Sequence, residues 1–305
     1  MSWKPIVVGV DASPEAAEAV TFASRMAERA RTTCRLVHAL RDVLASADVP
    51  ENVQYRHALV EQERSQLAAA LGHALPAPVL QTVTVRIGTP AVALKKAATE
   101  LGAELVVLGG KHHSTLGRWL GGSTSLDVAR TTAVPLLVTT GHTTIRRVLV
   151  AVDLSAAAGP TLAAAERYAA LFGAELRALS VLEPLPIIPE VTPPYESTEY
   201  YAMSEELLQR DVWSLIRTPE AERVVRHGTA VETILHEAEE WGAHLLVVGS
   251  HGKSWAERVL VGSVTERLLN QLPTSLLVVP PLAAAVAERA EVPAAVREQP
   301  LVAIA

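Results

Sequence analysis

Short apolar runs alternate with longer amphipathic segments along most of the chain. In the first part of the sequence, near-continuous Val, Leu and Ile runs predict strands, and the segments between them carry apolar residues at helical spacing. The predicted strands are residues 5–10, 34–39, 79–87, 104–108 and 136–139, and the predicted helices are residues 14–31, 55–73, 89–101 and 123–130. This alternating order predicts an α/β fold, in which a parallel sheet is covered by helices on both faces.

Residues at the ends of the predicted helices support these assignments. Ser13 is the expected N-cap of the helix at 14–31, and Pro14 suits its first turn. Gly102 follows the helix at 89–101, in the position where a glycine commonly ends a helix. In an open parallel sheet, ligands bind beyond the carboxyl ends of the strands, where the strand order reverses.

The same succession of segments occurs twice. The matched pairs are IVVGVDAS at 6–13 with VLVAVDLS at 148–155, IGTPAV at 87–92 with HGTAVE at 227–232, and LGAELVVLG at 101–109 with WGAHLLVVG at 241–249. A looser match joins residues 133–138 to residues 272–279. Four blocks in one order indicate a duplicated domain of about 140 residues. We therefore predict two tandem doubly wound domains, residues 1–141 and 145–281, each with a five-stranded parallel sheet.

The second copy contains a proline-rich stretch that the first copy lacks. Residues 182–195 include five prolines, which exclude a regular helix or a central strand. The stretch is either a lid or docking arm, or simply an inserted surface loop. Tyr195, Tyr200 and Tyr201 make a contact surface plausible beside it, and a helix is predicted at 204–216.

Two further segments lie outside the repeated pattern. Residues 141–144 are small and mostly polar, which suits a linker between the two domains. Residues 282–305 form a tail rich in Ala, Glu, Arg and Val, and its pattern favours at most a short helix at 282–290. We assign the tail no function.

Composition narrows the class of protein. The chain has 305 residues, 49% of them hydrophobic, which is enough for two cores. Its net charge is −6 without a long basic run, so nucleic acid is not an expected partner. Cys34 is the single cysteine, which excludes an intramolecular disulfide and a cysteine-rich zinc site. No signal peptide is evident, and the uncharged run at 273–287 is too short to span a membrane, so we expect a cytoplasmic protein.

A glycine-rich stretch in the second copy carries the strongest chemical signal. The predicted strand at 245–248 runs directly into it, and a helix is predicted at 264–271. Its key residues, in order, are Gly249, Gly252, Gly262 and Ser263. Glycines let backbone N–H groups approach a phosphate, and a helix N-terminus adds unpaired donors and a positive dipole end. The stretch therefore predicts an anion site.

Asp153 ends the first strand of the second copy, on the same rim of the predicted sheet as Gly249. Its carboxylate can accept a hydrogen bond from a ribose hydroxyl or contact a metal bound to phosphates. It also suits the start of a helix at Ser155 and Ala156, so both interpretations stay open.

Other motifs predict no further chemistry. Residues 252–254 resemble the end of a Walker A loop, but that loop requires a glycine where this chain has Val247. No G-x-G-x-x-G follows either first strand. His112 and His113 are adjacent, and adjacent residues rarely chelate one ion, so a solvated loop is the better interpretation. No nucleophile elbow is present, and we predict neither a metal site nor a catalytic residue.

These motifs resemble the universal stress protein family in its tandem two-domain form, over about residues 4–280. Nucleotide-binding members of that family carry a glycine, two residues, a glycine, nine residues, then glycine and serine or threonine. Gly249, Gly252, Gly262 and Ser263 match that spacing in full. The resemblance implies Rossmann-like domains of the adenine-nucleotide alpha-hydrolase type that bind ATP, with or without Mg²⁺.

The resemblance also assigns roles to residues of the second copy. Asp153 would lie beside the ribose and phosphates, and Val181 and Val248 would flank the adenine. The complete set of predicted binding residues is Asp153, Val181, Val248, Gly249, His251, Gly252, Gly262, Ser263 and Val264.

The first copy departs from the family pattern because His112 replaces the second glycine. A histidine side chain would intrude if that position needs a positive φ or close backbone approach. The weaker candidates that remain are Asp11, Ala39, Leu108, Gly109, Gly122, Ser123 and Thr124. We predict that the second domain binds ATP and that the first binds it weakly, differently or not at all.

Family members pair through their last strands. In a tandem chain, residues 136–139 can therefore pair with residues 276–279 internally, and the resemblance further implies a homodimer of whole chains.

Three functions remain open. The first is a nucleotide-binding stress-response regulator without dedicated catalysis. The second is a slow ATPase or phosphoryl-transfer enzyme, for which Asp153 and His251 are the candidates. The third is a module for another ligand or for protein partners, with residues 184–194 as the docking element.

Overall fold

The computed structural model describes residues 2–41, 50–110, 123–141, 144–184, 197–251 and 261–281. The elements of the first half, residues 2–141, are β1 (Ile6–Gly9), α1 (Pro14–Ala30), β2 (Cys34–Leu40), α2 (Pro50–Leu71), α3 (Ala77–Leu80), β3 (Thr84–Ile87), α4 (Pro90–Glu100), β4 (Leu105–Gly109), α5 (Ser123–Thr131) and β5 (Leu136–Thr139). Those of the second half, residues 144–281, are β6 (Arg147–Ala151), α6 (Ala158–Phe172), β7 (Glu175–Leu182), α7 (Ser197–Leu207), a π-helical turn (Leu208–Val212), a 3₁₀ turn (Trp213–Leu215), β8 (Glu222–His227), α8 (Ala230–Glu240), β9 (Leu245–Gly249), α9 (Ser263–Gln271) and β10 (Ser275–Val279). Strands and helices alternate in both halves, as the apolar pattern predicts.

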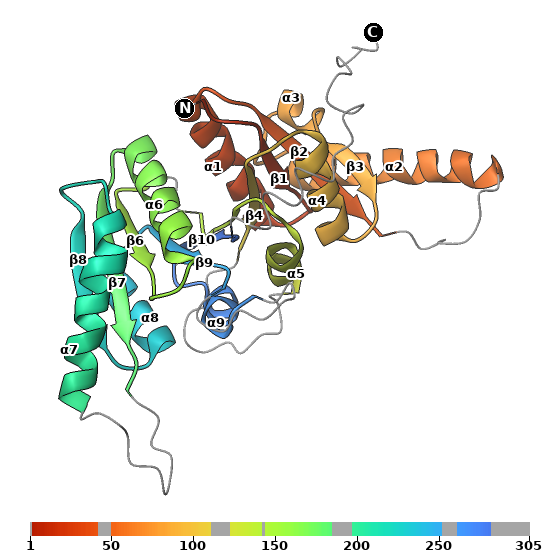
Figure 1. Ribbon diagram of the computed structural model, residues 1–305. Helices are drawn as coiled ribbons and strands as arrows, with labels where there is room; N and C mark the ends of the chain where they lie inside the picture. The colour runs from red at the N-terminus through yellow and green to blue at the C-terminus, as the bar shows by residue number, and fades with distance from the viewer. Residues whose placement is uncertain are drawn as a thin grey trace, which may run out of the picture.

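The strands form one ten-stranded sheet in the order β3-β2-β1-β4-β5-β10-β9-β6-β7-β8 (Figure 1). Every strand pair within a half is parallel, so the predicted five-stranded parallel arrangement is confirmed for each copy. In each half the strand order reverses beside the first strand, because β1 lies between β2 and β4 and β6 lies between β7 and β9. These two reversals are the expected positions for ligands.

The two halves join through their last strands. β5 and β10 are antiparallel, with Val138 opposite Leu276 and Leu137 opposite Leu277. All residues of both strands are buried, so the pairing hides two apolar edges that each half alone would expose. The predicted pairing within the chain is therefore confirmed.

Two apolar cores run along the sheet, one on each face, and both cross from one half to the other. Successive strand residues point to opposite faces. Val8 and Val150 belong to the core under α1 and α6, whereas Val106 and Leu246 belong to the core under α4, α5, α8 and α9. The halves therefore share their hydrophobic cores as well as their sheet.

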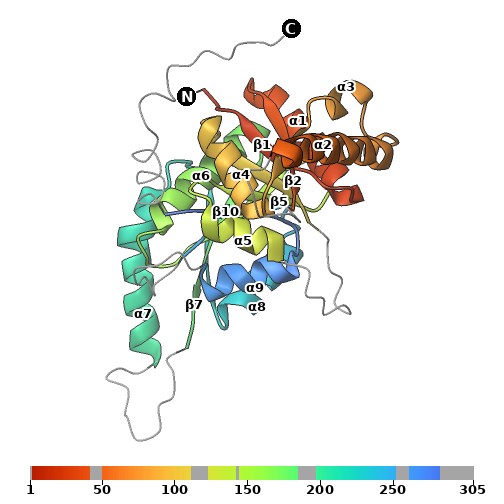
Figure 2. The same cartoon turned by 90° about the vertical axis from the view of Figure 1, so that its right-hand side faces the viewer.

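Helices and polar contacts also bridge the junction. α5 and α9 lie side by side there (Figure 2), and Arg130 on α5 is 3.3 Å from the carboxylate of Glu266 on α9. On the opposite face, Arg167 contacts Glu104 at 2.9 Å, and its guanidinium lies 3.6 Å from the centroid of the Trp3 ring. The junction thus combines paired strands, packed helices and ion pairs.

Helix ends follow the sequence signals. The Ala16 N–H donates to the Ser13 hydroxyl at 3.2 Å, which confirms Ser13 as the N-cap of α1. Gly102 has a φ of 56°, which glycine adopts without steric cost. Both positions are as predicted.

Several element boundaries differ from the predictions, and the helix expected at 55–73, for example, is α2 at Pro50–Leu71. The strand expected at 79–87 begins only at Thr84, because Val79 and Leu80 lie in the short helix α3, where Leu80 packs into the core beneath α2. An apolar pair is buried equally well by either structure, so local pattern could not separate them. The helix expected at 204–216 begins earlier, at Ser197, and continues as π and 3₁₀ turns.

Candidate functional site

A cavity of about 420 Å³, here called the second cavity, opens at the carboxyl ends of the second-half strands. Residues from the ends of β6, β7 and β9 and from the starts of α6, α8 and α9 line it. Because β6 pairs with β7 on one side and β9 on the other, the cavity lies at the reversal of strand order.

The second cavity gathers the residues that the sequence singles out. Eight of the nine predicted binding residues line it, namely Asp153, Val181, Val248, Gly249, His251, Gly262, Ser263 and Val264. The ninth, Gly252, lies outside the described residues. Segments more than 100 residues apart, from Asp153 to Val264, therefore meet at one cavity.

Hydrogen bonds fasten the start of α9 to the end of β9. The Gly262 N–H donates to the Ser250 carbonyl at 2.7 Å, and the Thr265 hydroxyl donates to the Gly249 carbonyl at 2.7 Å. A Cβ added to Gly249 would lie 3.1 Å from the Thr161 hydroxyl, so a side chain there would crowd the cavity wall. The first N–H groups of a helix have no intrahelical acceptor, and with the helix dipole they favour an anion at this end of α9.

Asp153 is half-buried at the end of β6, and the backbone holds its carboxylate in place. The Ser155 N–H donates to Asp153 Oδ1 at 3.1 Å, and the Ala157 N–H donates to the Ser155 hydroxyl at 3.3 Å. These bonds form a turn before the helix, so α6 begins at Ala158 and not at Ser155 or Ala156 as predicted. Asp153 therefore remains at the rim, facing the cavity.

Sequence reasoning missed several residues of the second cavity. Thr161, Glu183, Pro184, Tyr200, Ala230 and Ile234 also line it. Tyr200 comes from α7, and the start of that helix was predicted seven residues too late to bring Tyr200 to the site. The sequence did contain a signal for Tyr200, because a group of tyrosines lies at the end of the proline-rich stretch and just after it. Residues 185–196, which include most of that stretch and Tyr195, lie outside the described residues.

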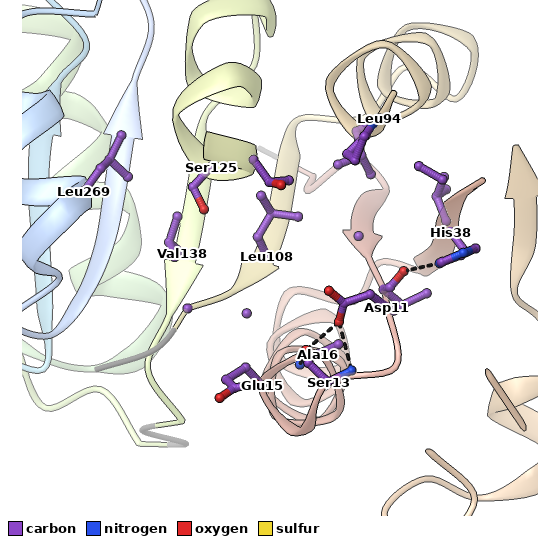
Figure 3. A pocket seen from close by; sticks show the side chains of 18 of the residues that line it. Asp11, Ser13, Glu15, Ala16, His38, Leu94, Leu108, Ser125, Val138 and Leu269 are labelled. Atoms are coloured by element: carbon purple, nitrogen blue, oxygen red, sulfur yellow. Dashed lines mark hydrogen bonds between the residues drawn. The ribbon is translucent and has the colours of Figure 1, made fainter. Parts of the chain in front are cut away.

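A smaller cavity of about 350 Å³, the first cavity, occupies the equivalent place in the first half (Figure 3). Of the weaker candidates, Asp11, Ala39, Leu108, Gly109 and Thr124 line it. Gly122 and His112 lie outside the described residues, and Ser123 begins α5.

Asp11 and His38 are polar residues of the first cavity whose side chains are held by hydrogen bonds. Asp11 Oδ1 accepts a hydrogen bond from the Ser13 N–H at 3.0 Å and another from the Ser13 hydroxyl. The His38 ring donates through Nδ1 to the Val10 carbonyl at 2.7 Å, and its Nε2 lies 3.3 Å from the Glu63 carboxylate. Figure 3 shows Asp11 and His38 close together at the carboxyl ends of their strands.

The model of the universal stress protein family matches residues 2–140 of the chain and, a second time, residues 144–280. The chain belongs to the universal stress protein family. Two successive matches make it a tandem member, and membership supports a role in stress response.

Known relatives and structures agree with this assignment. A universal stress protein of Mycolicibacterium smegmatis is 32% identical over 294 residues, which cover 90% of this chain and 97% of that protein. A universal stress protein structure from Archaeoglobus fulgidus gives a TM-score of 0.60 at 18% identity, covering 90% of this chain and 98% of that chain. A further structure, from Pseudomonas aeruginosa, gives a TM-score of 0.57 at 15% identity, covering 95% and 97%. These structures show a shared Rossmann-like fold.

In the described residues, no cluster of three His, Cys, Asp or Glu side chains is placed to hold a metal ion; His113, like His112, lies outside them. The Cys34 thiol donates to the Ala23 carbonyl at 3.1 Å, and burial raises its pKa to about 12, so it stays protonated and unreactive. Of the helices in the described segments, none is long and apolar enough to cross a bilayer.

Proposed function

We propose that this universal stress protein binds ATP in the second cavity and acts as a stress-response regulator without dedicated catalysis. The observation that carries the proposal is the meeting of the α9 N-terminus, the glycine at the end of β9 and the Asp153 carboxylate at one cavity of about 420 Å³. That volume is typical of small-molecule sites.

Each part of ATP has a matching part of the cavity. Apolar side chains of Val181, Val248 and Ile234 suit the faces of an adenine ring. Asp153 suits the ribose hydroxyls, because a carboxylate accepts hydrogen bonds. The start of α9 at Gly262 and Ser263 suits the phosphates. If Mg²⁺ enters with the phosphates, Asp153 is the carboxylate that could contact it.

Regulation fits the surroundings of the cavity better than catalysis does. Among the described residues at the cavity, His251 Nδ1 lies 2.9 Å from the Ser250 hydroxyl, which is the geometry of a base and a nucleophile, but Ser250 is 2% exposed and too buried to attack a ligand. α9, whose start would hold the phosphates, packs on α5 at the junction and carries Glu266, the partner of Arg130. A ligand at this helix therefore contacts an element that joins the two halves, which is how binding could favour one arrangement of the chain.

The test is to identify small molecules released from the purified protein by mass spectrometry and to titrate ATP into it by calorimetry. We expect one ATP per chain. An absence of ATP binding would overturn the proposal, and two equal sites per chain would contradict the predicted difference between the halves. Light scattering on the same sample measures the homodimer that we also propose.

His251 makes ATP binding dependent on pH in this proposal. Burial lowers the pKa of its imidazole, so the ring is neutral in the ligand-free protein at neutral pH. Bound phosphates would favour the imidazolium, and ATP affinity should therefore rise about three- to tenfold between pH 8 and pH 6.

The matched control for this pH effect is His251→Gln, which has no titrating ring. ATP itself titrates in this range, so the quantity to compare is the difference between the two proteins. Identical pH profiles in calorimetry would show that His251 does not sense the phosphates. Without ligand, the same burial predicts a fold that loses stability as pH falls below about 6.5, where the unfolded chain takes up the proton first.

A further inference from the structure

An aromatic side chain reaches the second cavity from α7, the helix that follows β7. Among the described residues that line this cavity, Tyr200 is the one Phe, Tyr or Trp side chain. In the first half α2 follows β2 in the same way, but no described residue of α2, and no described Phe, Tyr or Trp, lines the first cavity. The second cavity therefore has an aromatic wall that the described part of its counterpart lacks.

Tyr200 approaches the second cavity from the side opposite α9. The sheet order places β9, which precedes α9 in the chain, on one side of β6, and β7 and β8 on the other. Tyr201 stacks on His227 at the end of β8, so the start of α7 lies on the β7–β8 side, as Figures 1 and 2 show. A nucleotide with its phosphates at the start of α9 would therefore turn its base toward Tyr200.

The residue after Tyr200 fastens this part of α7 to the sheet. The Tyr201 and His227 rings are stacked, with centroids 4.1 Å apart and an interplanar angle of 10°. His227 Nε2 lies 3.4 Å from the carboxylate of Glu205, which is one helical turn further along α7. His227 is itself fixed by its pairing opposite Leu182 of β7. These contacts set the position of the Tyr200 backbone relative to the cavity.

The Tyr200 ring has no comparable structural task. Tyr201 packs against the core under α6, whereas Tyr200 belongs to neither core in the described part of the chain and is half-buried at the cavity. The nearby Glu183 carboxylate is already engaged, because it accepts a hydrogen bond from the Ala230 N–H at the start of α8 at 3.0 Å. Tyr200 is therefore the group at this end of the cavity with a free aromatic face.

We propose that the Tyr200 ring covers the base of a nucleotide bound in the second cavity, and that the stack of Tyr201 on His227 positions it. Every nucleobase has a π-face, and stacking on an aromatic side chain is a general way to bind one. Val181 and Val248 supply the apolar wall against which the base would be held. The inference rests on the proposed function, because it assigns a contact to the nucleotide proposed for this cavity.

The test is calorimetric titration of the full chain with ATP and, separately, with adenosine. Tyr200→Ala is expected to weaken both ligands by the same factor, about tenfold or more, because a stacking partner of the base is lost and the phosphate contacts are unchanged. Tyr200→Phe keeps the ring and should bind both ligands within about twofold of the unaltered chain.

A double-mutant cycle separates the positioning role of Tyr201 from a merely structural one. Tyr201→Ala should weaken both ligands about three- to tenfold, and Tyr201→Phe, which keeps the stack on His227, should restore binding. In a chain that already carries Tyr200→Ala, Tyr201→Ala should have almost no further effect, because no ring remains to be positioned. Equal factors in the two backgrounds would overturn the positioning role.

Met203→Ala is the matched control, since Met203 is exposed on the same helix and does not line the cavity, and it should change neither ligand. If Tyr200→Ala does not fold by urea denaturation, Tyr200→Leu, which keeps apolar bulk without an aromatic face, carries the same expectation. Unchanged affinities in the Tyr200 variants, with ATP bound normally by the unaltered chain, would overturn this inference alone. An unaltered chain that does not bind ATP would instead overturn the proposed function and this inference with it.

Discussion

Replacing Ser263 with aspartate is expected to weaken ATP binding about 100-fold or more while leaving the fold intact. Ser263 is exposed at the first position of α9, where the proposed phosphates would lie. A carboxylate there competes for the helix N-terminus and repels the phosphates, and at about 4 Å such a repulsion amounts to roughly 4 kcal/mol near a protein surface. Calorimetric titration of ATP measures the loss.

The same substitution should not harm the protein. An acidic residue in the first turn of a helix stabilises it by about 0.3–1 kcal/mol, so the melting temperature should stay the same or rise slightly. Ser263→Asn is the matched control, since it has nearly the same shape without the charge, and it should retain most of the ATP affinity. If Ser263→Asp binds ATP as well as the unaltered chain, the phosphates do not lie at α9.

Replacing Glu237 with alanine is expected to lower the free energy of unfolding by about 3 kcal/mol. The Glu237 carboxylate on α8 is 2% exposed and accepts hydrogen bonds from Arg177 at 2.6 Å and from Arg226 at 2.9 Å. The Arg177 guanidinium also lies 4.5 Å from the centroid of the Trp241 ring. Removing the carboxylate leaves two cationic groups without their shared buried partner, and a buried pair broken on one side is strongly destabilising.

Urea denaturation gives the change in unfolding free energy for this variant. Glu239→Ala, an exposed position two residues further along α8, is the control and should cost less than about 1 kcal/mol. In Glu237→Ala, Arg177 keeps its contact with the Glu222 carboxylate at 2.7 Å. We therefore expect a loss of unfolding free energy near the lower end of the range for a buried ion pair from which one partner is removed. Equal losses in the two variants would show that Glu237 contributes only through helix propensity.

The repeated alternation of strands and helices was predictable because it is local. A strand buried on both faces needs a continuous apolar run, as in Leu105–Gly109 and Leu245–Gly249, and that run is visible without any knowledge of its neighbours. The same holds for the helix start at Ser13. Where an apolar pair was compatible with both strand and helix, as at Val79 and Leu80, the local pattern was insufficient.

Much of the second cavity was predictable for a related reason. Parallel strands carry their carboxyl ends to one rim, so Asp153 and Gly249 had to lie near each other once the fold class was known. Tyr200 and Glu183 were not predictable in this way. Their positions depend on where α7 starts and on how the chain leaves β7, and no short-range rule sets either.

The sequence by itself therefore determined the fold class, the duplication and the rim that carries the candidate site, because strand burial, helix caps and glycine spacing are properties of short segments. Only the tertiary structure decided how the two copies differ in detail. It placed Glu15 in a cavity whose counterpart holds Ala157, and it brought Leu272 of the second half against Gly110 of the first. Such differences arise from contacts between segments far apart in the chain. At Gly110, for example, the absence of a side chain leaves space in the first half that the Leu272 side chain of the second half fills.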